Sequence, residues 1–197
     1  MRALLPGVHA WAHFSEEKQL DFNGLYLQLP GGTVLVDPPA LPARDLAQIE
    51  ALGRPSLILL TNKDHRRAAP EARARFGAPI AIHRRDAPLV DCSIDRTFED
   101  DELLAGALEV ISIPNGKSPG ESALYWHERR VLILGDALIG RPAGALSLLP
   151  PEKYASVEKA RQGLERLRSL AVDAVLVGDG VSILERGAER LAAFFEG

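Results

Sequence analysis

The sequence has a single cysteine among its 197 residues, so it cannot form an internal disulfide. A lone thiol, Cys92, fits a reducing compartment. No apolar run approaches the roughly 20 residues that a membrane-spanning helix needs. The first residues, Met1 to Pro6, also lack the sustained apolar segment of a signal peptide. These absences predict a cytoplasmic protein that has no membrane partner.

Lysine is scarce as well, with only 5 in the chain, so arginine carries most of the positive charge. The net charge is -4 and no basic cluster is evident, which argues against a nucleic-acid partner. The apolar fraction of 46% is enough for a globular core. We therefore expect a single domain spanning residues 1–197, with a small-molecule substrate or ligand as its partner. The oligomeric state cannot be read from the sequence.

The pattern of apolar residues predicts alternating strands and helices. A hairpin is expected over 25–29 and 33–36, because two apolar runs flank a Pro-Gly-Gly turn. Further strands are expected at 56–60, 78–82, 108–113, 122–126, 131–134 and 174–177. Helices are expected at 43–52, 66–76, 151–170 and 187–196, with 151–170 the longest. Two similar halves of this kind predict an α/β (α+β) fold of two packed sheets with helices outside.

Polar residues gather where several of these strands end. Asp37 and Pro38 follow the first hairpin, and the run from Thr61 to Arg67 (TNKDHRR) follows a buried strand. A loop from Pro114 to Glu121 (PNGKSPGE) precedes the second hairpin. Gly-Asp and Gly-Asp-Gly sequences then close the last two strands, at Asp136 and Asp179. Glycines at such positions permit tight turns or the close approach of a ligand.

In order and spacing, these five segments resemble the metallo-β-lactamase superfamily in its small, glyoxalase-II-like form. The resemblance covers nearly all of residues 23–180 and implies a four-layer αββα sandwich. It also implies hydrolytic chemistry at metal ions held by histidines, with Asp136 at the position of the aspartate that bridges two metals. Most of those histidines are replaced in this chain, so it resembles a divergent member.

Two alignments of the Thr61–Arg67 segment lead to different hypotheses. Without a gap, Asn62 and Asp64 fall at the first two histidines of the family motif, and Arg66 and Arg67 fall at its Asp-His pair. Lys117 falls at the third histidine and Asp179 at the last. On this alignment the metal site is lost. The chain is then a non-catalytic, metal-free relative whose Lys/Arg-filled pocket binds a small ligand or a partner.

The family binds its first metal through the first three histidines, and its second through the Asp-His pair, the bridging aspartate and the last histidine. With a two-residue gap, Asp64 and His65 become the Asp-His pair, and the first metal is lost. The resemblance then implies that Asp64, His65, Asp136 and Asp179 hold one divalent ion, such as zinc, manganese or iron. Such an ion would activate water for hydrolysis of an ester, thioester or phosphoester-type substrate. In this hypothesis Asn62, Lys117 and Asp136 are the catalytic residues, and Lys117 stabilises developing negative charge in place of the lost first ion. The sequence leaves both hypotheses open.

Overall fold

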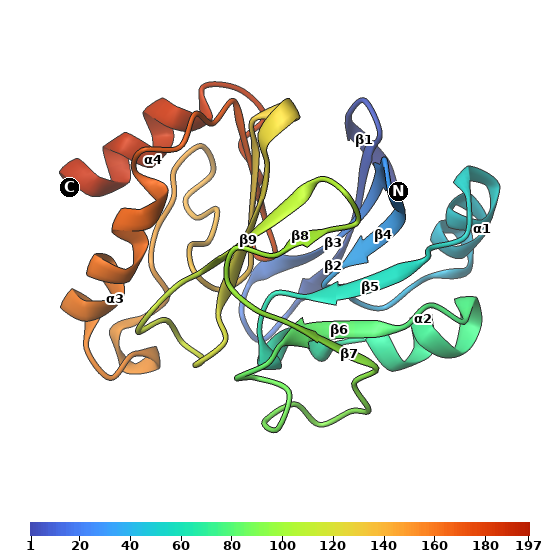
Figure 1. Cartoon of the computed structure of the whole chain (residues 1–197). Helices are drawn as coiled ribbons and strands as arrows, with labels where there is room; N and C mark the ends of the chain where they lie inside the picture. Colours follow the sequence, from blue (N-terminus) through green and yellow to red (C-terminus); the bar gives the residue numbers. More distant parts are fainter.

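The computed structural model describes all 197 residues and shows four layers (Figure 1). Two β-sheets pack against each other, and helices cover the outer face of each sheet. The expected α/β sandwich of the αββα type is therefore confirmed. None of the helices is long and apolar enough to cross a membrane.

The first sheet has seven strands in sequential order. Strands β1 to β4 pair antiparallel, and β4 to β7 pair in parallel. Helices α1 (Ala43–Leu52) and α2 (Ala69–Phe76) cover its outer face. The strands are β1 (Arg2–Leu5), β2 (Val8–Ser15), β3 (Leu20–Leu29), β4 (Gly32–Val36), β5 (Leu57–Leu60), β6 (Ile80–His83) and β7 (Arg96–Phe98).

The second sheet has five strands in the order β12-β11-β10-β9-β8. Its pairs are antiparallel except for β11 and β12, which run in parallel. Helices α3 (Val157–Leu164) and α4 (Gly187–Glu196) cover its outer face. The strands are β8 (Leu103–Leu104), β9 (Leu108–Ser112), β10 (Ser122–Trp126), β11 (Val131–Leu134) and β12 (Ala174–Val177).

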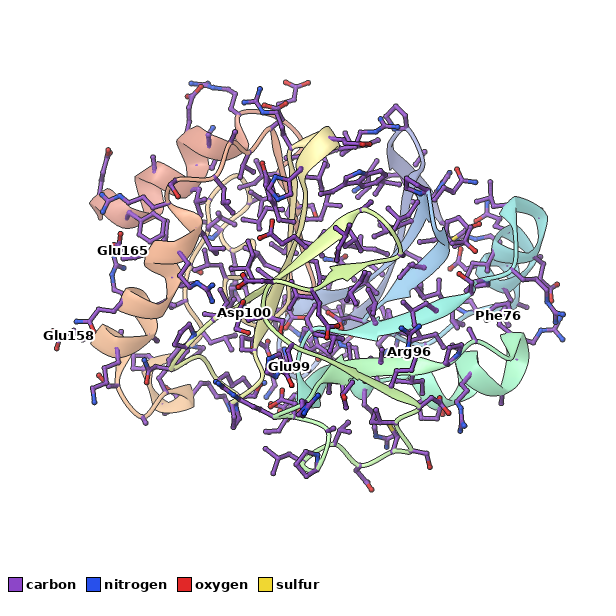
Figure 2. The ribbon with its side chains drawn as sticks, viewed as in Figure 1. Phe76, Arg96, Glu99, Asp100, Glu158 and Glu165 are labelled. Atoms are coloured by element: carbon purple, nitrogen blue, oxygen red, sulfur yellow. The ribbon has the colours of Figure 1, made fainter.

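Each pair of neighbouring layers encloses its own apolar core. Leu27 and Val34 of the first sheet meet Leu124 and Ile133 of the second in the central core. The helices pack on the outer faces through residues such as Phe76 of α2, whereas Glu158 and Glu165 on the α3 side point into solvent (Figure 2). Strands buried on both faces explain the continuous apolar runs in the sequence.

The predicted long helix at 151–170 is wrong. The segment divides into a 3-10 turn (Pro151–Lys153), helix α3 and a second 3-10 turn (Glu165–Leu167). Ser156 is extended, and its side chain accepts a hydrogen bond from Lys159 N, so helix α3 begins there with a serine N-cap. The segment does have helical periodicity, but the cap at Ser156 makes the helix begin at Val157. Strands β1, β2, β7 and β8 were not expected from the sequence.

The topology brings four strand ends together at one edge of the sandwich. Strands β4 and β5 are parallel neighbours in the first sheet, as are β11 and β12 in the second, so the residues that follow them converge. The sheets approach closely here, because a Cβ on Gly135 would lie 2.1 Å from Thr61 Oγ1. Glycine before Asp136 is thus needed for the two strand ends to meet.

Candidate functional site

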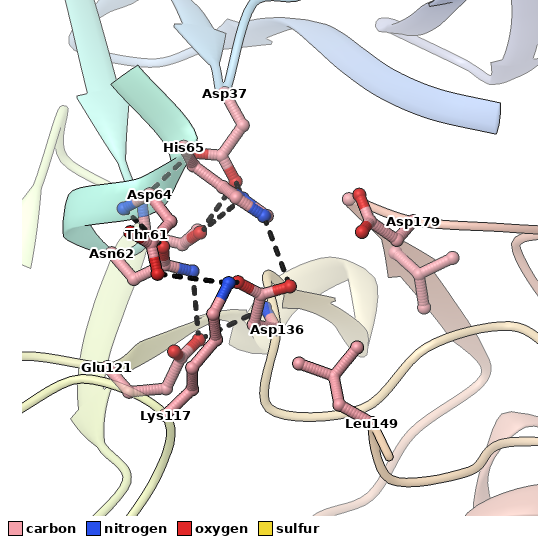
Figure 3. Close-up of polar contacts among 12 residues, drawn as sticks. Asp37, Thr61, Asn62, Asp64, His65, Lys117, Glu121, Asp136, Leu149 and Asp179 are labelled. Atoms are coloured by element: carbon pink, nitrogen blue, oxygen red, sulfur yellow. Dashed lines mark hydrogen bonds and ion pairs between the residues drawn. The ribbon is translucent and has the colours of Figure 1, made fainter. Parts of the chain in front are cut away.

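Asp37, directly after β4, organises the first part of the site (Figure 3). Its carboxylate accepts hydrogen bonds from Thr61 N at 2.9 Å and from Thr61 Oγ1 at 2.6 Å. His65 Nδ1 lies 2.9 Å from the same carboxylate. All three residues are buried. Asp37 therefore fixes the end of β5 and the orientation of the His65 ring.

His65 lies in the 3-10 turn Lys63–Arg66 with its other nitrogen facing the centre of the site. His65 Nε2 is 3.4 Å from Asp136 Oδ1 and 3.1 Å from Arg67 Nη2. Burial and the Arg67 guanidinium both lower the pKa of His65, but the carboxylates of Asp136 and Asp37 outweigh them and raise it to about 10. His65 Nδ1 therefore faces the Asp37 carboxylate, and Nε2 faces both the Asp136 carboxylate and the Arg67 guanidinium.

Lys117 is the cation that closes the lower part of the site. Its Nζ lies 2.7 Å from Asp136 Oδ2 and 2.9 Å from Asp64 Oδ2. Burial raises the pKa of Asp136, but the charges of His65 and Lys117 lower it by more. The resulting pKa lies well below the usual range. Asp136 is only 3% exposed, so this carboxylate depends on its cationic neighbours.

Arg67 is the cationic partner of Asp179, as Lys117 is of Asp136. Its guanidinium forms an ion pair with Asp179, and both side chains are 10% exposed. It also donates to the backbone carbonyls of Asn23 at 3.0 Å and Gly178 at 3.4 Å, and it lies 4.7 Å from the centre of the Phe22 ring. Arg67 thus connects the strand ends of both sheets, and its position is strongly fixed.

Asn62 and Glu121 form a buried pair beneath Lys117. Asn62 Oδ1 accepts from Asp64 N at 2.9 Å, and its Nδ2 donates to Glu121 Oε1 at 3.3 Å. Glu121 Oε1 also accepts from Asp136 N at 3.1 Å, whereas Oε2 has no hydrogen-bond partner. Burial and the charge of Asp136 raise the pKa of Glu121 well above its usual range, which favours the neutral acid.

Asp86 joins the two loops that carry this network. Its carboxylate accepts hydrogen bonds from Lys63 N at 2.9 Å, Ser118 Oγ at 2.6 Å and Gly120 N at 2.7 Å. Asp86 is fully buried. The loop of Asn62 and the loop of Lys117 therefore share one acceptor, which fixes their separation.

We expect Asp86→Asn to lower the free energy of unfolding by about 2 kcal/mol, because an amide NH2 then faces one of three buried donors. Urea unfolding followed by circular dichroism measures the change. Asp91→Asn, at an exposed position of the neighbouring loop, is the control and should leave stability unchanged. Equal stability of the two variants would contradict the role given to Asp86.

A cavity of about 660 Å³ opens above the network. Its floor contains His65, Asp136 and Asp179 together with the cations Lys117 and Arg67. Its walls are formed by half-buried apolar side chains from β3 and from the segment that follows Ile139. This volume is in the range of small-molecule sites.

The structure brings together most of the predicted site residues. His65, Asp136 and Asp179 have ligand atoms within 4.8 Å of one another. Asp64 lies outside that group, with its carboxylate bonded to Lys63 and Lys117. The other predicted residues are Asn62, which is fully buried, and Lys117, which lines the cavity. Arg66, by contrast, lines a separate cavity beside α2.

Sequence reasoning missed the roles of Asp37, Glu121 and Asp86. In the sequence, Asp37 stands out only as the residue that follows the first hairpin. Glu121 and Asp86 lie in loops, where acidic residues are ordinarily solvated, so their burial had no signal in the sequence.

As arranged, these side chains do not fit a pair of resident metal ions. At the positions of the first ion, the Asn62 amide is used at both ends and the Lys117 ammonium has no lone pair to offer. At the positions of the second ion, the Arg67 guanidinium is bonded to Asp179 and faces His65 Nε2. A metal could reach His65, Asp136 and Asp179 only if Arg67 moved away.

Comparisons with known proteins agree with the family resemblance seen in the sequence. The family model described as the metallo-beta-lactamase superfamily matches residues 1–196. A metallo-beta-lactamase from Pontibacter korlensis is similar in structure, with a TM-score of 0.76, 19% identity, and coverage of 96% of this chain and 92% of that one. A search of curated proteins gives no match.

Two further solved structures are similar. A metallo-beta-lactamase family protein from Thermus thermophilus has a TM-score of 0.73 and 21% identity, over 98% of this chain and 80% of that one. TTHA1623, solved in a di-iron-bound form, has a TM-score of 0.71 and 26% identity, over 88% of this chain and 94% of that one.

Proposed function

Because this chain belongs to the metallo-β-lactamase superfamily and yet carries side-chain cations among its former ligand positions, we propose that it is a metal-independent, ligand-binding member. Membership supports a hydrolase-like, metal-binding type of fold and leaves the substrate open. The proposal is that this fold now uses fixed ion pairs where its relatives use metal, and that the cavity above them binds a small molecule.

The observation that carries the proposal is the position of Lys117 Nζ, 2.7 Å from Asp136 and 2.9 Å from Asp64. In the ungapped alignment Asp64 and Lys117 both stand at histidine positions of the first metal. Two ligands have thus become an ion pair. Arg67 and Asp179 stand at histidine positions of the second metal, and they too form an ion pair.

This pairing explains why the substitutions occur together. A single change from histidine to lysine would place a cation beside a bound ion, and a change to aspartate alone would leave an unbalanced carboxylate, which at Asp179 is buried. Opposite charges at both former metal positions satisfy each other without an ion. The arrangement of the strand ends is kept, but its positive charge comes from Lys117 and Arg67.

We expect protein purified without added metal to contain far less than one equivalent of zinc, manganese or iron. Plasma mass spectrometry measures the content, and calorimetric titration should show no tight binding of these ions. The thermal midpoint should be the same with and without a chelator, because no ion links folding to metal. About one bound ion per chain, lost on Asp179→Ala, would refute the proposal.

A second candidate is favoured by one observation, the closeness of His65, Asp136 and Asp179. These three residues would hold a single ion if Arg67 swung out of the site. An ion there would lower the pKa of a bound water and polarise a substrate carbonyl or phosphoryl group. Zinc titration of the native chain beside Arg67→Met, which removes the competing cation, separates the candidates. Under the second candidate both chains bind zinc, whereas under the first the native chain does not.

A further inference from the structure

Two cations at the mouth of the cavity form no close ion pair. Arg141 and Lys153 both line the cavity and are exposed, and neither forms an ion pair with a carboxylate. A third cation, Lys18, is bonded to Glu17 at 2.6 Å, and the charge of Lys153 also acts on that carboxylate. Apart from Asp64, which is bonded to two lysines, Glu152 is the one exposed acidic residue that lines the cavity. The mouth is therefore locally positive in a chain whose net charge is -4.

Arg141 is held in place by the loops around it. Its Nη1 donates to the Lys18 carbonyl at 3.2 Å, and its own carbonyl accepts from Ser147 Oγ at 2.7 Å. Ile139 and Ser147 exchange two backbone hydrogen bonds at 2.9 and 3.0 Å, which closes the loop that carries Arg141. The backbone of Arg141 is thus fixed and its guanidinium has one bond to the neighbouring segment, which reduces the freedom lost on meeting an anion.

Between the mouth and the floor, the cavity wall is apolar. Leu20, Phe22, Leu148 and Leu149 line it and are half-buried, so each presents carbon surface to the cavity. The Phe22 ring is fixed from behind by the Arg67 guanidinium, 4.7 Å from its centre. A ligand with an apolar body would bury this surface.

On the floor of the cavity, in contrast, Lys117 and Arg67 are already paired with carboxylates. Lys117 is shared between Asp136 and Asp64, and Arg67 is bonded to Asp179. An anion placed on the floor would meet these carboxylates, whereas at the mouth it would meet unpaired cations. The anionic end of a ligand is thus directed outward and its apolar body inward.

We propose that the cavity binds a small organic anion with an apolar body, its anionic group on Arg141 and Lys153 and its body against Leu20, Phe22 and Leu149. The proposal rests on the metal-independent, ligand-binding function given above, and adds the chemical class of the ligand. Carboxylates, sulfonates and phosphates share the chemistry that these two cations recognise.

The test uses two fluorescent probes with the same apolar body. Anilinonaphthalene sulfonate carries a negative charge, and phenylnaphthylamine is its uncharged counterpart. In Arg141→Gln/Lys153→Gln, we expect the sulfonate to bind about tenfold more weakly, since two charge contacts are lost, and phenylnaphthylamine to bind unchanged. The matched control is Lys159→Gln/Arg190→Gln, which removes two exposed charges outside the cavity. It should leave both probes unaffected.

A second variant tests the location of the site. Leu149→Trp fills the apolar part of the cavity and should weaken both probes, while near-ultraviolet circular dichroism shows that the chain stays folded. Unchanged sulfonate binding in Arg141→Gln/Lys153→Gln, or in Leu149→Trp, overturns the proposal about the ligand. The metal content is measured on the same samples. A bound ion would overturn the metal-independent function instead, so the two failures are distinguishable.

Discussion

Asp37→Ala should lower the free energy of unfolding by about 4 kcal/mol, because each buried donor left without an acceptor costs roughly 1–3 kcal/mol. Three donors lose their partner: Thr61 N, Thr61 Oγ1 and His65 Nδ1. Asp37 also has a backbone φ of 47°, which alanine tolerates less well than aspartate. Denaturant unfolding at neutral pH gives the measurement.

A matched control separates the carboxylate from the backbone conformation. Asp101 is exposed and has a φ of 64°, so Asp101→Ala carries a similar backbone penalty without the buried hydrogen bonds. We expect Asp101→Ala to cost about 1 kcal/mol or less. Asp37→Asn keeps one carbonyl oxygen and should fall between the two. If Asp37→Ala cost no more than its control, Asp37 would not organise the site.

Lys117→Met should lower the free energy of unfolding by about 3 kcal/mol, because removing one partner of a buried ion pair leaves the other charge uncompensated. The affected group is Asp136, which keeps His65 at 3.4 Å but loses its contact of 2.7 Å with Lys117. Lys159→Met, on the exposed face of α3, is the control and should change stability little.

The double variant Lys117→Met/Asp136→Asn tests whether the pair itself is responsible. With both charges removed, the loss should be smaller than the sum of the two single losses. Additive losses would show that the side chains act independently, and the replacement of metal charge by Lys117 would then lack support.

The effect of Lys117 also has a defined dependence on pH. Burial lowers the pKa of Lys117, but Asp136 and Asp64 raise it more, whereas the pKa of Asp136 is lowered overall. The pair therefore contributes fully between the unfolded-state pKa values of about 3.9 for aspartate and about 10.4 for lysine. Its contribution fades as the pH falls through the folded pKa of Asp136 or rises through that of Lys117. Below the folded pKa of Asp136, or above that of Lys117, the native chain and Lys117→Met should have the same stability.

The family and most of the fold can be recognised in the amino-acid sequence. Buried strands of continuous apolar residues, such as β5 and β12, are readable because burial on both faces leaves no place for polar residues. Helices α1 and α4 were predicted with their observed bounds, since apolar spacing and flanking glycines mark both of them. The resemblance to the family motifs also located Lys117, Asp136 and Asp179. The last two follow the parallel strands β11 and β12, whose ends meet at one edge of the sheet.

The pairing of those residues, in contrast, depends on the packing of the two sheets. Asp64 and Lys117 are 53 positions apart, and Arg67 and Asp179 are 112 positions apart, so no local rule joins them. The choice between a metal ligand and an ion-pair partner depends on which side chain lies within about 3 Å of a carboxylate. That distance is set by the packing of two sheets, through Gly135 against Thr61 and through the shared acceptor Asp86. Sequence therefore identified the cluster of charges, and the fold decided that lysine and arginine, held by those contacts, neutralise it.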